Sequence, residues 1–257
     1  MNPSSPSSPR DVAKSVVTCA AQQHEKWLRS ESTPCGFIFE NQKANEGRFF
    51  FPEPFIGNPR APVAFIGINP QLDDQCTIYD PARINEFLDH TCRYHLTWTP
   101  RKRTGKWMNK MSAYLNEALG YGPRSFAEGG AIKMNAAACR STKWNSSKGT
   151  ACIRLCRMNL DAVMRLCKPL IMIAAGKDAF KWLKDQAIDE SGRFGPMDRL
   201  SGGFQDNLEK KCIVSVGNLS VVALITPPGM YWWLKEYVLD EVARVASTIR
   251  QARVSKA

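Results

Sequence analysis

A short apolar segment that ends abruptly in a polar turn constrains this chain more than any other feature. Residues 63–66 read Val-Ala-Phe-Ile, and Gly67-Ile68-Asn69-Pro70 follows directly. A continuous apolar run bounded by proline and glycine is typical of a central strand that is covered on both faces. Ligands of open α/β sheets bind at the carboxyl ends of such strands. An ordinary strand-to-loop junction has the same pattern, so the segment alone indicates only a candidate ligand-binding site.

The charge of the chain points to the class of partner. The net charge is +11 and the isoelectric point is about 9.3, which favours a polyanionic partner, nucleic acid before a membrane surface. A basic protein without such a partner is the alternative. No apolar run is long enough to span a membrane, and the Ser/Pro-rich residues 1–10 lack the apolar core of a signal peptide. We therefore expect a cytoplasmic protein with a disordered N-terminal tail.

The cysteine pattern favours free thiols in a reducing compartment. The chain has nine cysteines and no Cys-x-x-Cys, and its three histidines lie far apart, so the spacing of zinc ligands is absent. A cluster of cysteines that are distant in the sequence stays open, and its candidates are Cys139, Cys152, Cys156 and Cys167.

Hydrophobic periodicity predicts alternating helices and strands. We expect helices over 11–30, 81–88, 105–119, 152–167, 176–183 and 231–250, and strands over 48–57 (an edge strand or loop), 62–67, 131–138, 170–175, 212–216 and 219–225. Gly217-Asn218 predicts a hairpin between the last two strands. This alternation indicates a single three-layer α/β/α domain over 11–250 with a central, mostly parallel sheet and a basic tail over 251–257. Residues 71–104 are expected to be largely irregular, and 187–211 to be an exposed insertion.

Three of these strands end in unusual polar or proline-rich motifs. The motifs are Gly67-Ile68-Asn69-Pro70, then Asn135 with Arg140-Ser141-Thr142, and Thr226-Pro227-Pro228-Gly229-Met230. Parallel strands would bring all three to one edge of the sheet. In this order the motifs resemble those of the uracil-DNA glycosylase superfamily, over most of residues 48–240. The first is similar to the Gly-Ile-Asn-Pro of the mismatch-specific and thymine-DNA glycosylase branch.

Three further segments support the resemblance. Residues 107–110 (Trp-Met-Asn-Lys) resemble the start of a helix in that branch, and 135–140 resemble the Asn-x-x-x-Cys-Arg strand end of the iron–sulfur branches. Residues 166–179 look like the penultimate strand and turn of the superfamily.

The resemblance implies a DNA-repair glycosylase that flips a uracil or a related deaminated or mismatched base and hydrolyses its N-glycosidic bond. Asn69 would position the attacking water, and Asn135 would bind the O4 and N3 edge of a pyrimidine. A neutral amide orients water but accepts its proton poorly, so such an enzyme should be slow. Gly67, Ile68 and Pro70 would line the base pocket. Tyr79 would stack on the base or, alternatively, anchor its loop.

The last motif departs from the superfamily, which usually shows His-Pro-Ser or Asn-Pro-Ser. Here Thr226 stands in the first position, where it can donate one hydrogen bond to the leaving base but cannot become cationic. Pro228 has no hydroxyl and no backbone N–H, so a phosphate contact is lost there. By the same resemblance Gly229 and Met230 contact DNA, with Met230 as the apolar wedge that fills the gap left by the flipped nucleotide.

Basic residues near the motifs are candidates for phosphate contacts. They are Arg101, Lys102, Arg103, Lys106 and Arg140. A solvated charged face is the alternative for the first four, and for Arg140 a pairing with Asp73 or Asp74.

We expect a monomer without a cofactor. Cys139 and Cys156 fall near the second cysteine pair of the iron–sulfur branches, but the first pair is missing, so buried thiols are favoured over an iron–sulfur cluster. Two other functions stay open. One is a catalytically silent member of the fold that binds DNA or a modified base, and the other is an unrelated α/β enzyme with Gly176-Lys177 as an anion site.

Overall fold

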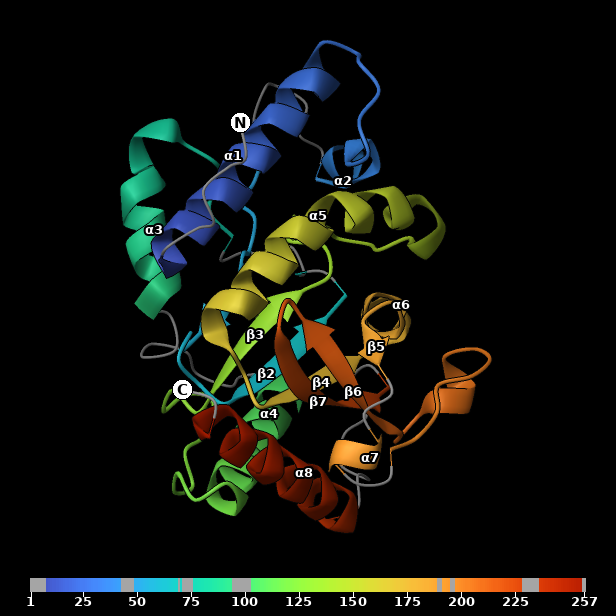
Figure 1. The fold of residues 1–257 in the computed structure, drawn as a ribbon. Helices are drawn as coiled ribbons and strands as arrows, with labels where there is room; N and C mark the ends of the chain where they lie inside the picture. The colour runs from blue at the N-terminus through green and yellow to red at the C-terminus, as the bar shows by residue number, and fades with distance from the viewer. Residues whose placement is uncertain are drawn as a thin grey trace.

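The computed structural model describes residues 8–42, 49–68, 70, 76–93, 103–188, 191–194, 197–227 and 236–255. Seven strands form one sheet in the order β1-β3-β2-β4-β7-β6-β5 (Figure 1). The strands are β1 (Ile56–Gly57), β2 (Val63–Gly67), β3 (Ala131–Asn135), β4 (Ile171–Ala175), β5 (Ala187–Ile188), β6 (Lys211–Val216) and β7 (Leu219–Thr226). The helices are α1 (Pro9–Leu28), α2 (Gly36–Asn41), α3 (Ile84–Arg93), α4 (Arg103–Ala118), α5 (Ser146–Cys167), α6 (Lys177–Lys184), α7 (Ser191–Phe194) and α8 (Glu236–Val254), with short 3₁₀ turns at Pro81–Arg83 and Gln205–Asn207.

The centre of the sheet is parallel and its margins are antiparallel. Strands β3, β2, β4 and β7 run in the same direction, whereas β1 joins β3, and β6 joins β7 and β5, in antiparallel pairs. The predicted α/β class with parallel central strands is confirmed. The β6–β7 hairpin turns at residues 217–218, as predicted.

Helices cover both faces of the sheet because its central strands are apolar on both sides. In β2, Ala64 and Ile66 join the core under α1, α3, α5 and α6, while Val63 and Phe65 join the core under α4 and α8. All four side chains are buried, as a strand in the middle of a parallel sheet requires. Figure 1 shows α1, α3 and α5 on one side of the sheet and α8 on the other.

Several boundaries differ from the prediction. The strand predicted over 131–138 ends at Asn135, and the helix predicted over 81–88 continues to Arg93. Helix α5 begins at Ser146, because the Asn145 side chain accepts from the backbone N–H groups of residues 147 and 148 and caps the helix. Helix α8 continues to Val254, so most of the predicted basic tail is helical. The predicted exposed insertion over 187–211 contains the buried Phe194 and Asn207.

No helix in the described part of the chain is long and apolar enough to cross a membrane.

Candidate active site at the carboxyl edge of the sheet

The three predicted strand ends meet at one edge of the sheet. Gly67 at the end of β2 pairs with Asn135 at the end of β3, and Thr226 at the end of β7 pairs with Ala175 of β4, which lies beside β2. The chains that follow β2 and β3 stay side by side, with bonds from the N–H of Ala136 to the carbonyl of Gly67 (3.0 Å), from Ala137 to Ile68 (2.9 Å) and from Ser141 to Pro70 (3.2 Å). The first two motifs therefore run alongside each other beyond the sheet.

Asn135 is the buried polar centre of this edge. Its side chain is only 4% exposed, and its Nδ2 donates to Oε1 of Glu53 at 2.9 Å. An ionised carboxylate only accepts hydrogen bonds, so Glu53 determines which end of the amide faces it. The other end, Oδ1, lies over Gly67: a Cβ built on that glycine would be 2.8 Å from it.

Glu53 is a buried carboxylate that the sequence analysis missed. It is 7% exposed, and it accepts from Nζ of Lys133 (2.7 Å) and from the guanidinium of Arg140 (3.2 Å). Burial opposes ionisation, but the two cations and the hydrogen bonds from Lys133 and Asn135 outweigh it and lower the pKa of Glu53 to about 2. Its only signal in the sequence is an acidic residue between two prolines after an aromatic run.

Arg140 lies at the same edge and contributes to this ion-pair network. Besides its pairing with Glu53, its Nε donates to the carbonyl of Phe51 at 3.2 Å. The partners expected from the sequence, Asp73 and Asp74, lie outside the described residues. Arg140 thus helps to hold the segment before β2 against the end of β3.

Thr226 lies at the predicted edge but is fully buried. Its hydroxyl donates to the carbonyl of Ala174 at 3.5 Å, and its own carbonyl accepts from the N–H of Gly176. In this arrangement the hydroxyl bonds to strand β4, the carbonyl holds the turn after β4, and the buried hydroxyl is not presented to a ligand. Pro228, Gly229 and Met230 lie outside the described residues.

Tyr79 belongs to an aromatic cluster. Its ring stacks on Phe49 with centroids 4.6 Å apart and meets Phe51 edge-on at 5.1 Å, and its N–H donates to the carbonyl of Phe49. These contacts match those expected of a loop anchor, the alternative to base stacking.

The predicted basic run is only partly described. Lys106 is exposed in the first turn of α4, and Trp107 beside it packs edge-on against Phe65. Arg103 begins α4, but its side chain is not described, and Arg101 and Lys102 lie outside the described residues. Asn69 also lies outside the described residues, whereas its neighbours Ile68 and Pro70 are placed by the backbone hydrogen bonds given above.

Asp178 is a second buried carboxylate at this edge that the sequence analysis did not find. It lies in the first turn of α6, directly after β4, where the helix dipole favours a negative charge. Its Oδ2 accepts from the indole N–H of Trp144 (2.8 Å) and from the hydroxyl of Ser146 (3.0 Å). Asp178 thereby ties the start of α5 to the turn after β4.

Thiols gather behind the site. Cys35, Cys139, Cys152 and Cys156 are buried in one cluster, in which the sulfurs of Cys35 and Cys152 are 3.5 Å apart. Three of the four cysteines considered in the sequence analysis are present, and Cys35 takes the place of Cys167, which lies in the core under α5. The described residues contain no group of His, Cys, Asp or Glu side chains arranged to hold a metal ion.

No protein-family model matches the chain, and no curated protein is detectably similar to it in sequence.

Proposed function

We propose that this chain is a DNA-repair glycosylase with a uracil-DNA glycosylase-like fold, which flips a uracil or a related deaminated or mismatched base out of DNA and hydrolyses its N-glycosidic bond. One observation carries the proposal: residues 67, 68 and 70 of the first motif run beside the residues that follow β3, and the buried amide of Asn135 at the end of β3 lies against Gly67. A flipped base is read by hydrogen bonds to its edge, and an amide that is fixed at the end of a central strand can supply them.

The contacts of Asn135 support a role in reading the base edge. Glu53 takes one of the two N–H groups of the amide, which leaves the second N–H and Oδ1 for a base. A donor beside an acceptor complements the O4 and N3–H of uracil. Cytosine has an amino group and an unprotonated N3 at these positions, so the same amide would reject it.

The proposed chemistry is slow hydrolysis without a cofactor. Asn69 would orient water towards the C1′ carbon of the flipped nucleotide, and its amide cannot take the proton of that water at low cost. Glu53 does not replace it as a base, because a carboxylate with a pKa of about 2 accepts protons weakly at neutral pH. Most of the rate would then come from stabilisation of the departing base in a dry pocket.

The net charge of +11 supports DNA as the partner of a monomeric enzyme. Arg101, Lys102, Arg103 and Lys106 would contact phosphates, and Gly229 with Met230 would enter the gap left by the flipped nucleotide.

The decisive experiment is a cleavage panel. Fluorescently labelled oligonucleotides carrying uracil, hypoxanthine, xanthine or a G·T mismatch, single- and double-stranded, are incubated with the protein and then with alkali, which cuts abasic sites. We expect product from at least one substrate.

Asn69→Ala should lower the rate about 100-fold, the size of effect typical for a group that acts directly on the reacting centre. The matched control, Asn218→Ala in the exposed β6–β7 turn at the opposite edge, should leave the rate unchanged. Absence of product from every substrate would refute the proposal.

A second candidate function is a silent member of the same fold that binds DNA or a modified base. The buried hydroxyl of Thr226 favours it, because the end of β7 then offers no donor to a leaving base. Salt-sensitive binding of the oligonucleotides without any product would identify this function.

A further inference from the structure

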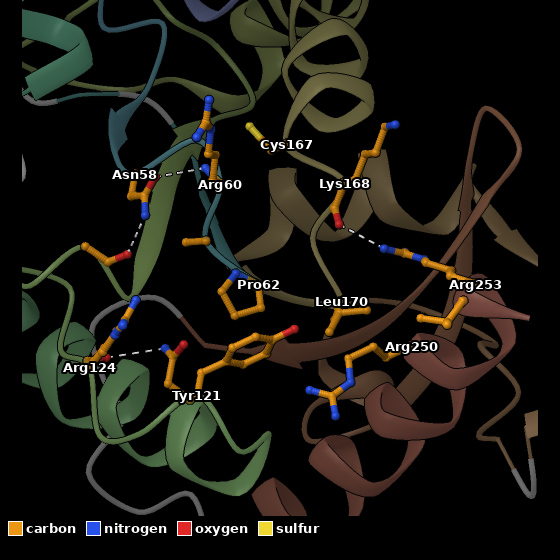
Figure 2. A pocket seen from close by; sticks show the side chains of 14 residues that line it. Asn58, Arg60, Pro62, Tyr121, Arg124, Cys167, Lys168, Leu170, Arg250 and Arg253 are labelled. Carbon is orange, nitrogen blue, oxygen red and sulfur yellow. Dashed lines mark hydrogen bonds between the residues drawn. The ribbon is translucent and has the colours of Figure 1, made fainter. Parts of the chain in front are cut away.

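The edge of the sheet opposite the candidate active site carries a cavity of about 600 Å³. Its walls come from the segments that precede β2, β3 and β4 and from the C-terminal ends of α4, α5 and α8 (Figure 2). The cavity thus lies at the amino ends of the parallel strands, a full strand length away from Gly67 and Asn135. A volume of this size suits a small organic ligand.

The lining is strongly basic. Five of its side chains are cationic, none is acidic, and they come from four separate segments of the chain, with the last two on α8: Arg60, Arg124, Lys168, Arg250 and Arg253. No ion pair within the described part of the chain joins any of the five to a carboxylate. Such a cavity attracts an anion that carries several charges.

Two of the five cations also have a structural role. Arg253 donates to the carbonyls of residues 168, 169 and 220, and Arg250 donates to the carbonyl of Leu119 at 3.0 Å. Carbonyl oxygens carry only partial charges, so both guanidinium groups keep their net positive charge. The side chains of Arg60, Arg124 and Lys168 are exposed, and Lys168 caps the end of α5 in a left-handed backbone conformation (φ 48°).

An aromatic ring lies among these cations. Figure 2 shows Tyr121 reaching across the cavity beneath Pro62, and the guanidinium of Arg250 lies 5.4 Å from the centre of its ring. A flat apolar ring between guanidinium groups suits a ligand that joins a base or another planar group to phosphates.

We propose that this cavity binds a nucleoside polyphosphate, or the phosphorylated end of a nucleic acid strand, with Arg60, Arg124 and Lys168 on the phosphates and Tyr121 beside the base. The site is independent of the proposed glycosylase function, because the two sites occupy opposite edges of the sheet.

The test is binding of a fluorescently labelled deoxynucleoside triphosphate, followed by anisotropy at low salt. We expect saturable binding that the double variant Arg60→Gln/Arg124→Gln weakens at least about tenfold, since it removes two charge-assisted hydrogen bonds to phosphate. The matched control Lys14→Gln/Arg154→Gln removes the same charge from exposed positions outside the cavity and should change affinity less than twofold. Absence of saturable binding, or equal losses in both double variants, would overturn the proposal.

Two further measurements identify the ligand. Tyr121→Leu should weaken the nucleotide but not inorganic tripolyphosphate, and equal weakening of both would remove the base from the proposal. An unlabelled deoxynucleoside triphosphate and a 5′-phosphorylated oligonucleotide are then compared as competitors. Displacement of the labelled nucleotide at a lower concentration of the triphosphate indicates a free nucleotide, and displacement at a lower concentration of the oligonucleotide indicates a strand end. Base excision by Arg60→Gln/Arg124→Gln should equal that of the unmodified chain. Nucleotide binding is measured without reference to base excision, so it tests this cavity even if the chain excises no base.

Discussion

Gly67 at the end of β2 lies so close to Oδ1 of Asn135 that a larger residue there would have to displace the amide at the end of β3. A Cβ at position 67 would be 2.8 Å from that oxygen, and the amide cannot simply turn away, because its nitrogen is held by Glu53. The small residue of the first motif and the amide of the second are therefore fitted to each other.

Gly67→Ala should consequently displace the Asn135 amide. We expect a loss of about 1–3 kcal/mol in the free energy of unfolding from overpacking, and a fall of about 10- to 100-fold in base excision, because small displacements of a positioning group are costly. Denaturant unfolding and the cleavage panel measure the two effects. The matched control is Gly203→Ala, where the nearest atom to the new Cβ would be at an ordinary 3.5 Å. Unchanged excision by Gly67→Ala would show that Asn135 does not contact the base.

Glu53→Gln should destabilise the protein, because it leaves Lys133 and Arg140 partly buried without a counter-charge. Removing one partner of a buried ion pair costs about 3–5 kcal/mol, and we expect a loss at or below the lower end because both cations retain some contact with water. Glu117→Gln, on the exposed face of α4, is the control and should change stability by less than about 0.5 kcal/mol. Equal stability of the two variants would contradict the network described above.

The same carboxylate predicts how stability depends on pH. The pKa of Glu53 is lowered from 4.5 to about 2, so the folded state binds the proton less readily than the unfolded chain does. Its contribution, about 3 kcal/mol, is fully present above pH 4.5 and is lost as the pH falls towards 2. Unfolding free energies measured between pH 6 and pH 3 should fall more steeply for the unmodified chain than for Glu53→Gln. Parallel curves would mean that folding leaves the pKa of Glu53 unshifted.

The central strands were predictable because their signal is local. Residues 63–66 and 171–174 are continuous apolar runs, and a strand buried on both faces needs nothing more to be recognised. The meeting of Gly67 and Asn135 also followed from the sequence, since adjacent parallel strands end at one edge.

The polar network of the site was not predictable in the same way. Glu53 is far in sequence from Lys133 and Arg140, and only the pairing of β1 and β3 brings the segments together. Arg253 was predicted to belong to a basic tail, because the backbone carbonyls that accept its hydrogen bonds carry no sequence signature. Thr226 was predicted to donate to a ligand, whereas its hydroxyl donates to the carbonyl of Ala174 in β4, an acceptor without a sequence signature.

Thiol accessibility tests the packing behind the site. Six cysteines are buried (Cys35, Cys139, Cys152, Cys156, Cys167 and Cys212), and burial raises the pKa of the partly buried Cys19 to about 12. In a Cys76→Ser/Cys92→Ser background, the seven remaining thiols of the nine should react with Ellman's reagent only slowly at pH 8 and completely in guanidinium chloride. Rapid reaction of several of these seven thiols in the folded state would show that the core around them opens readily.

Thr226→Val separates a catalytic hydroxyl from a structural one. The two side chains have nearly the same shape, and the hydroxyl of Thr226 is fully buried and bonded to the carbonyl of Ala174, so its removal should cost about 1 kcal/mol of stability. If that bond is its whole role, base excision by Thr226→Val stays within about twofold of the unmodified chain. A donor to the leaving base would instead be worth a factor of about 100 in rate, even for a variant that remains folded. Thr226→Ser keeps the hydroxyl and should retain the activity in both cases. A fall in activity in Thr226→Val alone, measured with a substrate that the unmodified chain cleaves, would assign the end of β7 to the chemistry. The hydroxyl would then have to turn away from Ala174 when DNA is bound.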